Sequence, residues 1–196
     1  AEKEFRFPLE YGNQRPLSAS WTVTGSGAFV VDKDPGNAPR ASITGITTGK
    51  IVDYGLKDSM NMGACMAPAA ASTITRHFKD FGTRPEDYDY IITGDLGSVG
   101  QTVLLDLLRE RGYDIAKNHL DCGMLIYDSK TQDTHAGGSG CGCCAVTLSA
   151  YILRQLEDKS WKKVLFVPTG ALLSKTSFNE GKTVPGIAHA LVLESS

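Results

Sequence analysis

The strongest constraint on the fold is a long stretch of small and apolar residues that begins at Cys143. It reads CCAVTLSAYILRQLEDK and contains no charged residue before Arg154. At helical spacing its apolar side chains cover nearly the whole circumference, and a helix without a polar face is buried on every side. We therefore expect residues 143–159 to form a central helix that lies between two layers of the protein.

Segments typical of strands and of helices alternate along the rest of the chain. We predict strands at 18–33, 41–52, 90–93, 122–128 and 187–194, a strand followed by a loop at 162–173, and helices at 67–81 and 99–112. Pro68 is expected in the first turn of its helix and Gly82 at the C-cap of that helix. This alternation is typical of an α/β layered fold, and the central helix favours a five-layer arrangement with helices in the middle.

Size and charge narrow the possible functions. A chain of 196 residues fits one domain, and its net charge of −2 supplies no field that would hold nucleic acid or an anionic membrane. No apolar run approaches the ~18 residues of a membrane span. The opening residues AEKEFRFPLEYG include neither a starting methionine nor the hydrophobic segment of a signal peptide. From this start we expect a fragment of a longer protein.

Three of the five cysteines lie together at Cys141, Cys143 and Cys144. An odd number with this clustering does not suit a disulfide framework, so we expect reduced thiols in a cytosolic setting. A zinc site completed by Cys122 and His135 lacks the usual two separated cysteine pairs. The favoured interpretation is that small thiols pack as apolar residues. A reactive Cys141, with its pKa lowered at a helix start, is the other alternative.

The glycines at 137, 138 and 140 precede the central helix and leave two interpretations open. Backbone amides at a helix start favour an anion such as a carboxylate or a phosphate, whereas glycine also lets a helix approach its neighbour closely. The sequence His119-Leu120-Asp121-Cys122 holds the residue types of nucleophilic catalysis. Its spacing does not bring these side chains within hydrogen-bond reach, and a structural histidine is the alternative.

Seven stretches together resemble one known family over essentially the whole chain. They read, in order, VTGSGA, MAPAAA, DYDYIITGDLGSVG, HLDCGMLIY, AGGSGCGCCAV, VPTGALLS and IAHALVLE. The chain resembles the C-terminal part of the stage V sporulation protein AD family, a thiolase-like group of endospore-forming bacteria. The resemblance implies an αβαβα fold made of two similar halves. Residues 1–40 would be the closing strands of an incomplete N-terminal half, and residues 41–196 would be the C-terminal half.

The resemblance also implies a role in sporulation. The family is expected to bind dipicolinic acid (pyridine-2,6-dicarboxylic acid), with calcium as a possible companion ion, and to support its uptake into the developing spore without another cofactor. Expected partners are the missing N-terminal half, a second copy in a homodimer and membrane proteins of the same operon, but no nucleic acid. The expected location is the cytoplasm or the periphery of the inner forespore membrane.

Condensing enzymes of this fold use residues that the chain lacks. Their catalytic histidine, in a His-Gln-Ala-Asn stretch, would fall within residues 94–97, and their asparagine, in a Gly-Asn-Thr-Ser stretch, within residues 137–140. Their nucleophilic cysteine belongs to the first half of the fold. We therefore expect a protein that is not an enzyme, with no catalytic residue and no metal ligand.

Nine residues are candidates for ligand binding: Asp95, His119, Asp121, Gly138, Ser139, Gly140, Cys141, Thr169 and Gly170. Two alternatives stay open. One is an acyltransferase of the condensing-enzyme type that acts on acyl thioesters through His119 with Cys122 or Cys141. The other is a scaffold that only docks on membrane partners.

Overall fold

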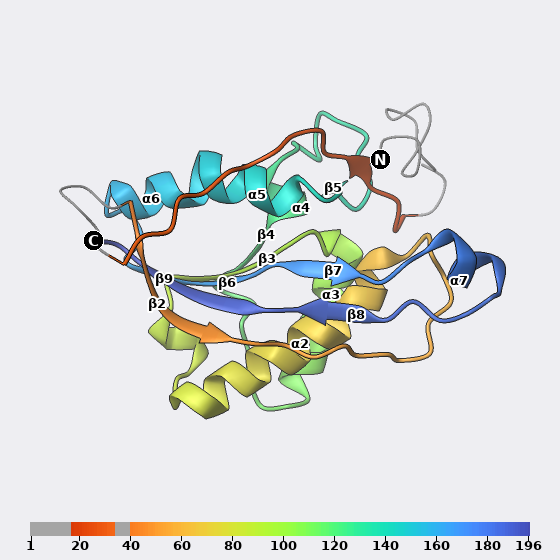
Figure 1. The fold of residues 1–196 in the computed structure, drawn as a ribbon, viewed down its shortest axis with the longest axis horizontal. Coiled ribbons are helices and arrows are strands. Elements are labelled where there is room, and N and C mark those ends of the chain that lie inside the picture. Colours follow the sequence, from red (N-terminus) through yellow and green to blue (C-terminus); the bar gives the residue numbers. More distant parts are fainter. Residues whose placement is uncertain (1–16, 34–39) are drawn as a thin grey trace.

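The computed structural model describes residues 17–33 and 40–196, and its centre is a five-stranded mixed sheet (Figure 1). The strands, in spatial order, are β2 (Ser42–Thr47), β9 (Ala190–Glu194), β6 (Lys163–Val167), β3 (Tyr90–Thr93) and β4 (His119–Asp121). β6, β3 and β4 run parallel, whereas β9 runs antiparallel to both β6 and β2. The predicted α/β class is confirmed.

Helices cover both faces of this sheet (Figure 1). On one face lie α2 (Met62–Phe81) and α3 (Gly97–Arg109), and on the other lie α5 (Cys143–Thr147), the π-helical turn η2 (Leu148–Ile152) and α6 (Leu153–Glu157), which follow one another without a break. Successive strand residues point to opposite faces. Ile91 therefore packs in the core beneath α2 and α3, while Ile92 packs in the core beneath α5 and α6.

The central helix is less enclosed than its composition predicts. Cys143, Ile152 and Leu156 face the sheet and are fully buried, but Ala150 and Tyr151 are exposed, Tyr151 to 42%. The prediction of burial on every side is therefore wrong for the described chain. Among residues 17–33 and 40–196, the extended segment 23–29 alone passes over the outward side of this helix, where a Cβ on Gly25 would lie 2.6 Å from Cγ2 of Val146.

Shorter elements complete the described fold. They are β1 (Trp21–Thr22), η1 (Pro85–Asp87), α4 (Cys122–Leu125), β5 (Gly138–Ser139), β7 (Thr169–Ala171), α7 (Lys175–Asn179) and β8 (Gly186–Ala188). β1 pairs with β5 in parallel, and β7 pairs with β8 in the antiparallel sense. None of the helices that the structure describes is both long and apolar enough to cross a membrane.

Several strand predictions are wrong in their extent. The strand predicted at 41–52 ends at Thr47, and the one predicted at 187–194 is two strands, β8 and β9, that belong to different sheets. Within 18–33 only Trp21–Thr22 forms a strand. The later apolar residues of this segment pair with no strand among the described residues, and Val30 is 98% exposed. The strand predicted at 122–128 is instead the short helix α4. The carboxylate of Asp121 accepts a hydrogen bond from the amide of Gly123 and caps this turn, so the strand ends at residue 121.

The first long helix is correct in type and in its end. Gly82 adopts a left-handed conformation with φ of 63° and forms the predicted C-cap. The helix begins five residues earlier than predicted, because the side chain of Asn61 accepts a hydrogen bond from the amide of Ala64 and acts as the N-cap. Pro68 therefore lies inside the helix and not in its first turn.

The division of the chain at residue 40 stays a prediction. Residues 1–16 and 34–39, which make up much of the predicted N-terminal part, lie outside the described residues. The described residues 17–33 run along the layer of α5 and α6 and contribute no strand to the five-stranded sheet (Figure 1).

Candidate functional site

The candidate site forms where the parallel strands β3 and β4 end. Asp95 lies two residues beyond β3, and Asp121 is the last residue of β4. The register pairs Thr93 with Asp121, so both carboxylates lie at the same edge of the sheet. In sheets with parallel strands, this edge is the usual position of ligand sites.

Asp95 joins three segments that are far apart in the sequence. Its Oδ2 accepts hydrogen bonds from the Ser139 hydroxyl at 2.9 Å and from the Gly140 amide at 3.0 Å, and its Oδ1 accepts one from the Thr169 hydroxyl at 3.3 Å. Burial raises the pKa of the Asp95 carboxyl, and these hydrogen bonds partly oppose that shift. The Gly140 amide, which one of the two interpretations of these glycines offers to an incoming anion, is thus occupied by a carboxylate of the protein itself.

Asp121 is almost completely buried and accepts four hydrogen bonds. The donors are the amides of Leu96 and Gly97 at 3.0 Å, the amide of Gly123 at 3.1 Å and the hydroxyl of Thr93 at 2.7 Å. Burial raises the pKa of Asp121 to about 7, although the hydrogen bonds act in the opposite direction. Asp121 therefore fixes the loop that carries Asp95 and the start of α3.

His119 is a buried, neutral member of the same network. Its Nε2 lies 3.0 Å from the Thr93 hydroxyl, and its Nδ1 lies 2.9 Å from Nε2 of Gln101. The Thr93 proton goes to Asp121, so Nε2 of the imidazole donates to Thr93 and Nδ1 accepts from the Gln101 amide. Burial lowers the pKa of His119 to about 4, so the ring is neutral near pH 7.

Two thiols near the site, those of Cys122 and Cys143, are poor nucleophiles. Burial raises the pKa of Cys143, and the neighbouring Cys144 together with burial raises that of Cys122. Cys141 is exposed at the surface. Within residues 17–33 and 40–196, no three His, Cys, Asp or Glu side chains come together to hold a metal ion. The packing interpretation of Cys122 and Cys143 thus agrees with their complete burial.

Six of the nine candidate residues belong to two adjoining networks. The first network contains Asp95, Ser139, Gly140 and Thr169, and the second contains His119 and Asp121. They adjoin because Asp121 binds the amides of residues 96 and 97, directly after Asp95. Whether any of these residues binds a ligand stays a prediction.

The other three candidates have different surroundings. A Cβ on Gly138 would lie 2.7 Å from both Ile126 and Val23, so this glycine permits close packing of β5. Gly170 pairs with Ile187 between β7 and β8. The exposed Cys141 makes no hydrogen bond to either network in the part of the chain that the structure describes, and it lies just before α5.

Two further residues of the second network were not identified from the sequence. Thr93 and Gln101 hold His119 from opposite sides, through Nε2 and Nδ1 of its ring. The available signal was the position of Thr93 at the carboxyl end of a buried strand. For Gln101, the signal was a polar side chain on the same turn of α3 as the buried Gly97 and Gly100.

Comparison with solved structures finds enzymes of the thiolase group. They include acetyl-CoA acetyltransferase from Syntrophomonas wolfei, with a TM-score of 0.49 and 16% identity over 81% of this chain and 32% of that one. They also include human mitochondrial 3-ketoacyl-CoA thiolase, with a TM-score of 0.42 and 18% identity over 81% of this chain and 31% of that one.

A much closer match comes from the sequence itself. The chain is 48% identical over 194 residues to stage V sporulation protein AD of Bacillus subtilis strain 168, a match that covers 99% of this chain and 56% of that protein. The chain thus spans little more than half the length of this relative. A family model described as stage V sporulation protein AD matches residues 1–194. The chain therefore belongs to the stage V sporulation protein AD family.

Proposed function

We propose that the protein is a sporulation protein that binds dipicolinic acid without catalysing a reaction and supports its uptake into the developing spore. It would act in the cytoplasm or at the inner forespore membrane, with membrane proteins of the same operon. One observation carries the proposal: a carboxylate, Asp95, stands in the segment 94–97, where condensing enzymes of this fold would place their catalytic histidine. It occupies the nearby amide and hydroxyl donors of Gly140 and Ser139.

This arrangement does not suit thioester condensation. Condensing chemistry needs hydrogen-bond donors aimed at the developing oxyanion, and the loss of one such donor costs roughly 10²–10³-fold in rate. Asp95 accepts hydrogen bonds when ionised, and the neutral His119 uses both ring nitrogens within the protein. The raised pKa values of Cys122 and Cys143 also disfavour a thiolate nucleophile.

The charge of Asp95 favours a particular form of the ligand. Dipicolinate carries two carboxylates at neutral pH, so a free dianion beside an ionised Asp95 is repelled. A calcium chelate removes this repulsion, because calcium binds six to eight oxygen ligands and the chelate brings some of them. We therefore propose that the site takes the calcium chelate. Asp95 would turn to the ion, and the hydroxyls of Ser139 and Thr169, which donate to Asp95 in this structure, would then donate to the ligand carboxylates instead.

The test is calorimetric titration of dipicolinate into the full-length protein, with and without calcium. We expect saturable, calcium-dependent binding of about one ligand per chain, and at least tenfold weaker binding by Asp95→Asn, which loses one charge contact worth about 1.4 kcal/mol or more. Asp106→Asn is the matched control, because Asp106 is an exposed carboxylate paired with Arg109 on α3. Absence of binding with and without calcium would overturn the proposal. Full affinity in Asp95→Asn would overturn the role of Asp95 alone.

The acyltransferase alternative makes a separate prediction. An enzyme of that type would carry an acyl group on a thiol after incubation with acetyl-coenzyme A. Intact-mass measurement should show no added acyl group on the wild-type protein. The scaffold alternative predicts that no small molecule binds at all, so the titration above also separates it from the proposed function.

We also propose that the missing N-terminal half of the same protein covers the outward face of α5, η2 and α6, in an assembly that forms a homodimer. The support is an open, largely apolar groove of about 380 Å³ on this face, lined by residues that include Leu125, Ile126, Val146 and Tyr151. Sedimentation of the full-length protein should give the mass of a dimer.

A further inference from the structure

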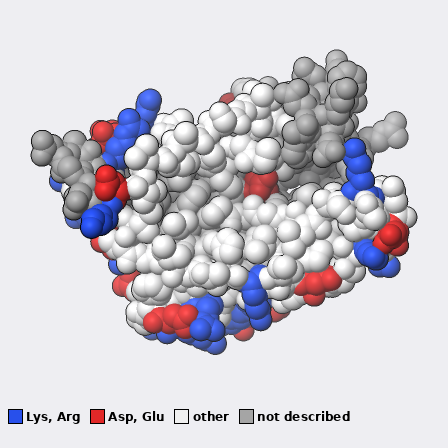
Figure 2. Space-filling model, viewed as in Figure 1, with Lys and Arg blue, Asp and Glu red and all other residues white. Residues whose placement is uncertain are grey.

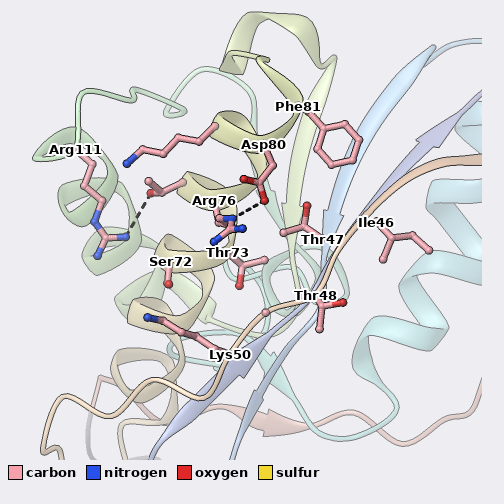
Figure 3. Close-up of a pocket in the computed structure, with 13 residues that line it drawn as sticks. Ile46, Thr47, Thr48, Lys50, Ser72, Thr73, Arg76, Asp80, Phe81 and Arg111 are labelled. Atoms are coloured by element: carbon pink, nitrogen blue, oxygen red, sulfur yellow. Dashed lines mark hydrogen bonds and ion pairs between the residues drawn. The ribbon is translucent and has the colours of Figure 1, made fainter.

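A second groove, of about 890 Å³, lies on the opposite face of the sheet from α5 and α6. Figure 3 shows that it opens between the end of β2 and one side of α2. Charged side chains gather over the α2 side of the molecule in Figure 2, whereas the middle of that face carries few charges. The groove shares no residue with the networks of Asp95 and Asp121.

Basic side chains from three separate segments line this groove. Arg76 and Lys79 come from α2, Lys50 comes from the loop after β2, and Arg111 comes from the turn after α3. The one acidic side chain of the lining is Asp80. The lining therefore carries a net charge of +3, although the whole chain carries −2.

Hydroxyl groups accompany these cations on α2. Ser72, Thr75, Arg76 and Lys79 follow the spacing i, i+3, i+4 and i+7, which places them along one side of a helix. Figure 3 shows Ser72 between Lys50 and Arg76, at the opening that Arg111 borders. The groove thus offers both charged and neutral donors within one surface.

The cationic groups keep free donors and are partly fixed in position. Asp80 accepts a hydrogen bond from Nε of Arg76, and the terminal nitrogens of that guanidinium bond to none of the described residues. Arg111 makes two long contacts, of 3.4 Å each, to the hydroxyls of Thr75 and Tyr54. Lys50 and Lys79 form no ion pair with the part of the chain that the structure describes.

The groove changes character along its length. Ile46 and Phe81 lie on the side away from Lys50 and Arg111, as Figure 3 shows. Ile46 is 62% exposed and Phe81 is 45% exposed. Phe81 stacks on the buried His77 ring at 4.5 Å between centroids, which holds its outer face toward the groove. A ligand that fits both ends carries an anionic group and an organic part that can pack on Ile46 and Phe81.

We propose that this groove binds a phosphate ester. A phosphate group offers several acceptor oxygens and up to two negative charges, and guanidinium groups bind it in a bidentate manner while lysines act as point charges. The hydroxyls of Ser72 and Thr75 donate to the remaining oxygens. The volume exceeds that of one phosphate group, so the organic part of the ester lies toward Ile46 and Phe81. The ester is either a soluble phosphorylated molecule or the headgroup of a phospholipid.

Two binding assays on the full-length protein separate these sources. The soluble arm is calorimetric titration with adenosine 5′-diphosphate, which is a phosphate ester. The lipid arm is co-sedimentation with phosphatidylcholine vesicles that contain phosphatidylglycerol, compared with phosphatidylcholine alone. Binding in the soluble arm assigns a soluble phosphate ester, and binding in the lipid arm alone assigns a headgroup.

Matched variants tie the binding to the groove. The double variant Arg76→Gln/Lys79→Gln removes two exposed charges from the lining and should weaken binding at least about tenfold, because charge-assisted hydrogen bonds contribute roughly 1.5–3 kcal/mol each. The control Arg109→Gln/Lys117→Gln removes the same charge outside the groove and should leave binding unchanged. Equal losses in both double variants, or no binding in either arm, would overturn the proposal. Asp95→Asn should leave this binding unchanged, since the two sites share no residue.

Discussion

Replacing Asp121 by asparagine tests whether burial or hydrogen bonding determines the pKa of the carboxylate at the centre of the site. Burial raises the pKa of Asp121 from 3.8 to about 7. A carboxyl with a raised pKa in the folded state stabilises the fold least at high pH, because the unfolded chain ionises first. The stability contribution therefore falls as the pH rises from about 4 to about 7.

The size of the effect follows from the two pKa values. Between pH 5 and pH 8, a group with pKa values of 3.8 unfolded and about 7 folded lowers the free energy of unfolding by about 2.5 kcal/mol. Asparagine has no charge and shows no such dependence. The substitution also has a cost that is independent of pH: the asparagine NH₂ group cannot accept from the Leu96 amide, and a buried amide without an acceptor costs about 1–3 kcal/mol.

The protonated carboxyl avoids this cost. It can donate to the Thr93 hydroxyl, whose own proton then turns to the carbonyl of Leu120, 3.4 Å away, while the Leu96 amide keeps its acceptor. The geometry thus accommodates both protonation states of Asp121. The asparagine variant resembles the protonated state except at the Leu96 amide.

The assay is urea unfolding of wild type and Asp121→Asn at pH 5, 6, 7 and 8. The difference between their free energies of unfolding cancels the contribution of every other titrating group. We expect this difference to move by about 2.5 kcal/mol in favour of the variant between pH 5 and pH 8. A difference that does not change with pH would show that burial does not raise the pKa of Asp121, because the four hydrogen bonds keep it near its ordinary value.

Three further predictions concern other parts of the fold. Burial lowers the pKa of His77 to about 4, so as the pH falls its imidazole binds a proton in the unfolded chain before it does in the folded one. The free energy of unfolding should therefore fall by about 2 kcal/mol between pH 6.5 and pH 4.5. Urea unfolding of His77→Gln should lack this contribution. Helix propensity alone predicts that Gly100→Ala stabilises α3 by about 1 kcal/mol. A Cβ there would lie 2.8 Å from Cα of Gly63, so we expect thermal unfolding to show a loss of stability of about 1–3 kcal/mol. A gain of stability would contradict this packing. Iodoacetamide at pH 8 should label the exposed Cys141 well before Cys143, whose pKa is raised by burial; equal rates by mass spectrometry would show that Cys143 is accessible.

The sequence identifies several residues that the structure brings together, but it does not predict how they interact. The resemblance singled out Asp95, Ser139, Gly140 and Thr169 as separate candidates, and the structure joins them through hydrogen bonds. The anion-binding role of the Gly140 amide was inferred from its place before a helix. That inference could not include the carboxylate of Asp95, which reaches this amide from 45 positions away.

Elements with local signals can be predicted from the order of residues alone. The helix that ends at Gly82 and the buried strand at 90–93 follow from hydrophobic spacing and from the left-handed backbone that glycine adopts without strain. Such signals act within one or two turns of the chain, so neighbouring residues suffice to specify them.

Which distant residues meet depends on the folded arrangement and could not be predicted from spacing. Lys50, Arg76, Lys79 and Arg111 are scattered over more than sixty positions of a chain with a net charge of −2, yet they line one groove. The outward face of α5 and α6 is likewise open, although its composition suggests a fully buried helix. The physical reason is the same in both cases: charge clustering and burial depend on how layers pack in space, and spacing along the chain does not encode that packing.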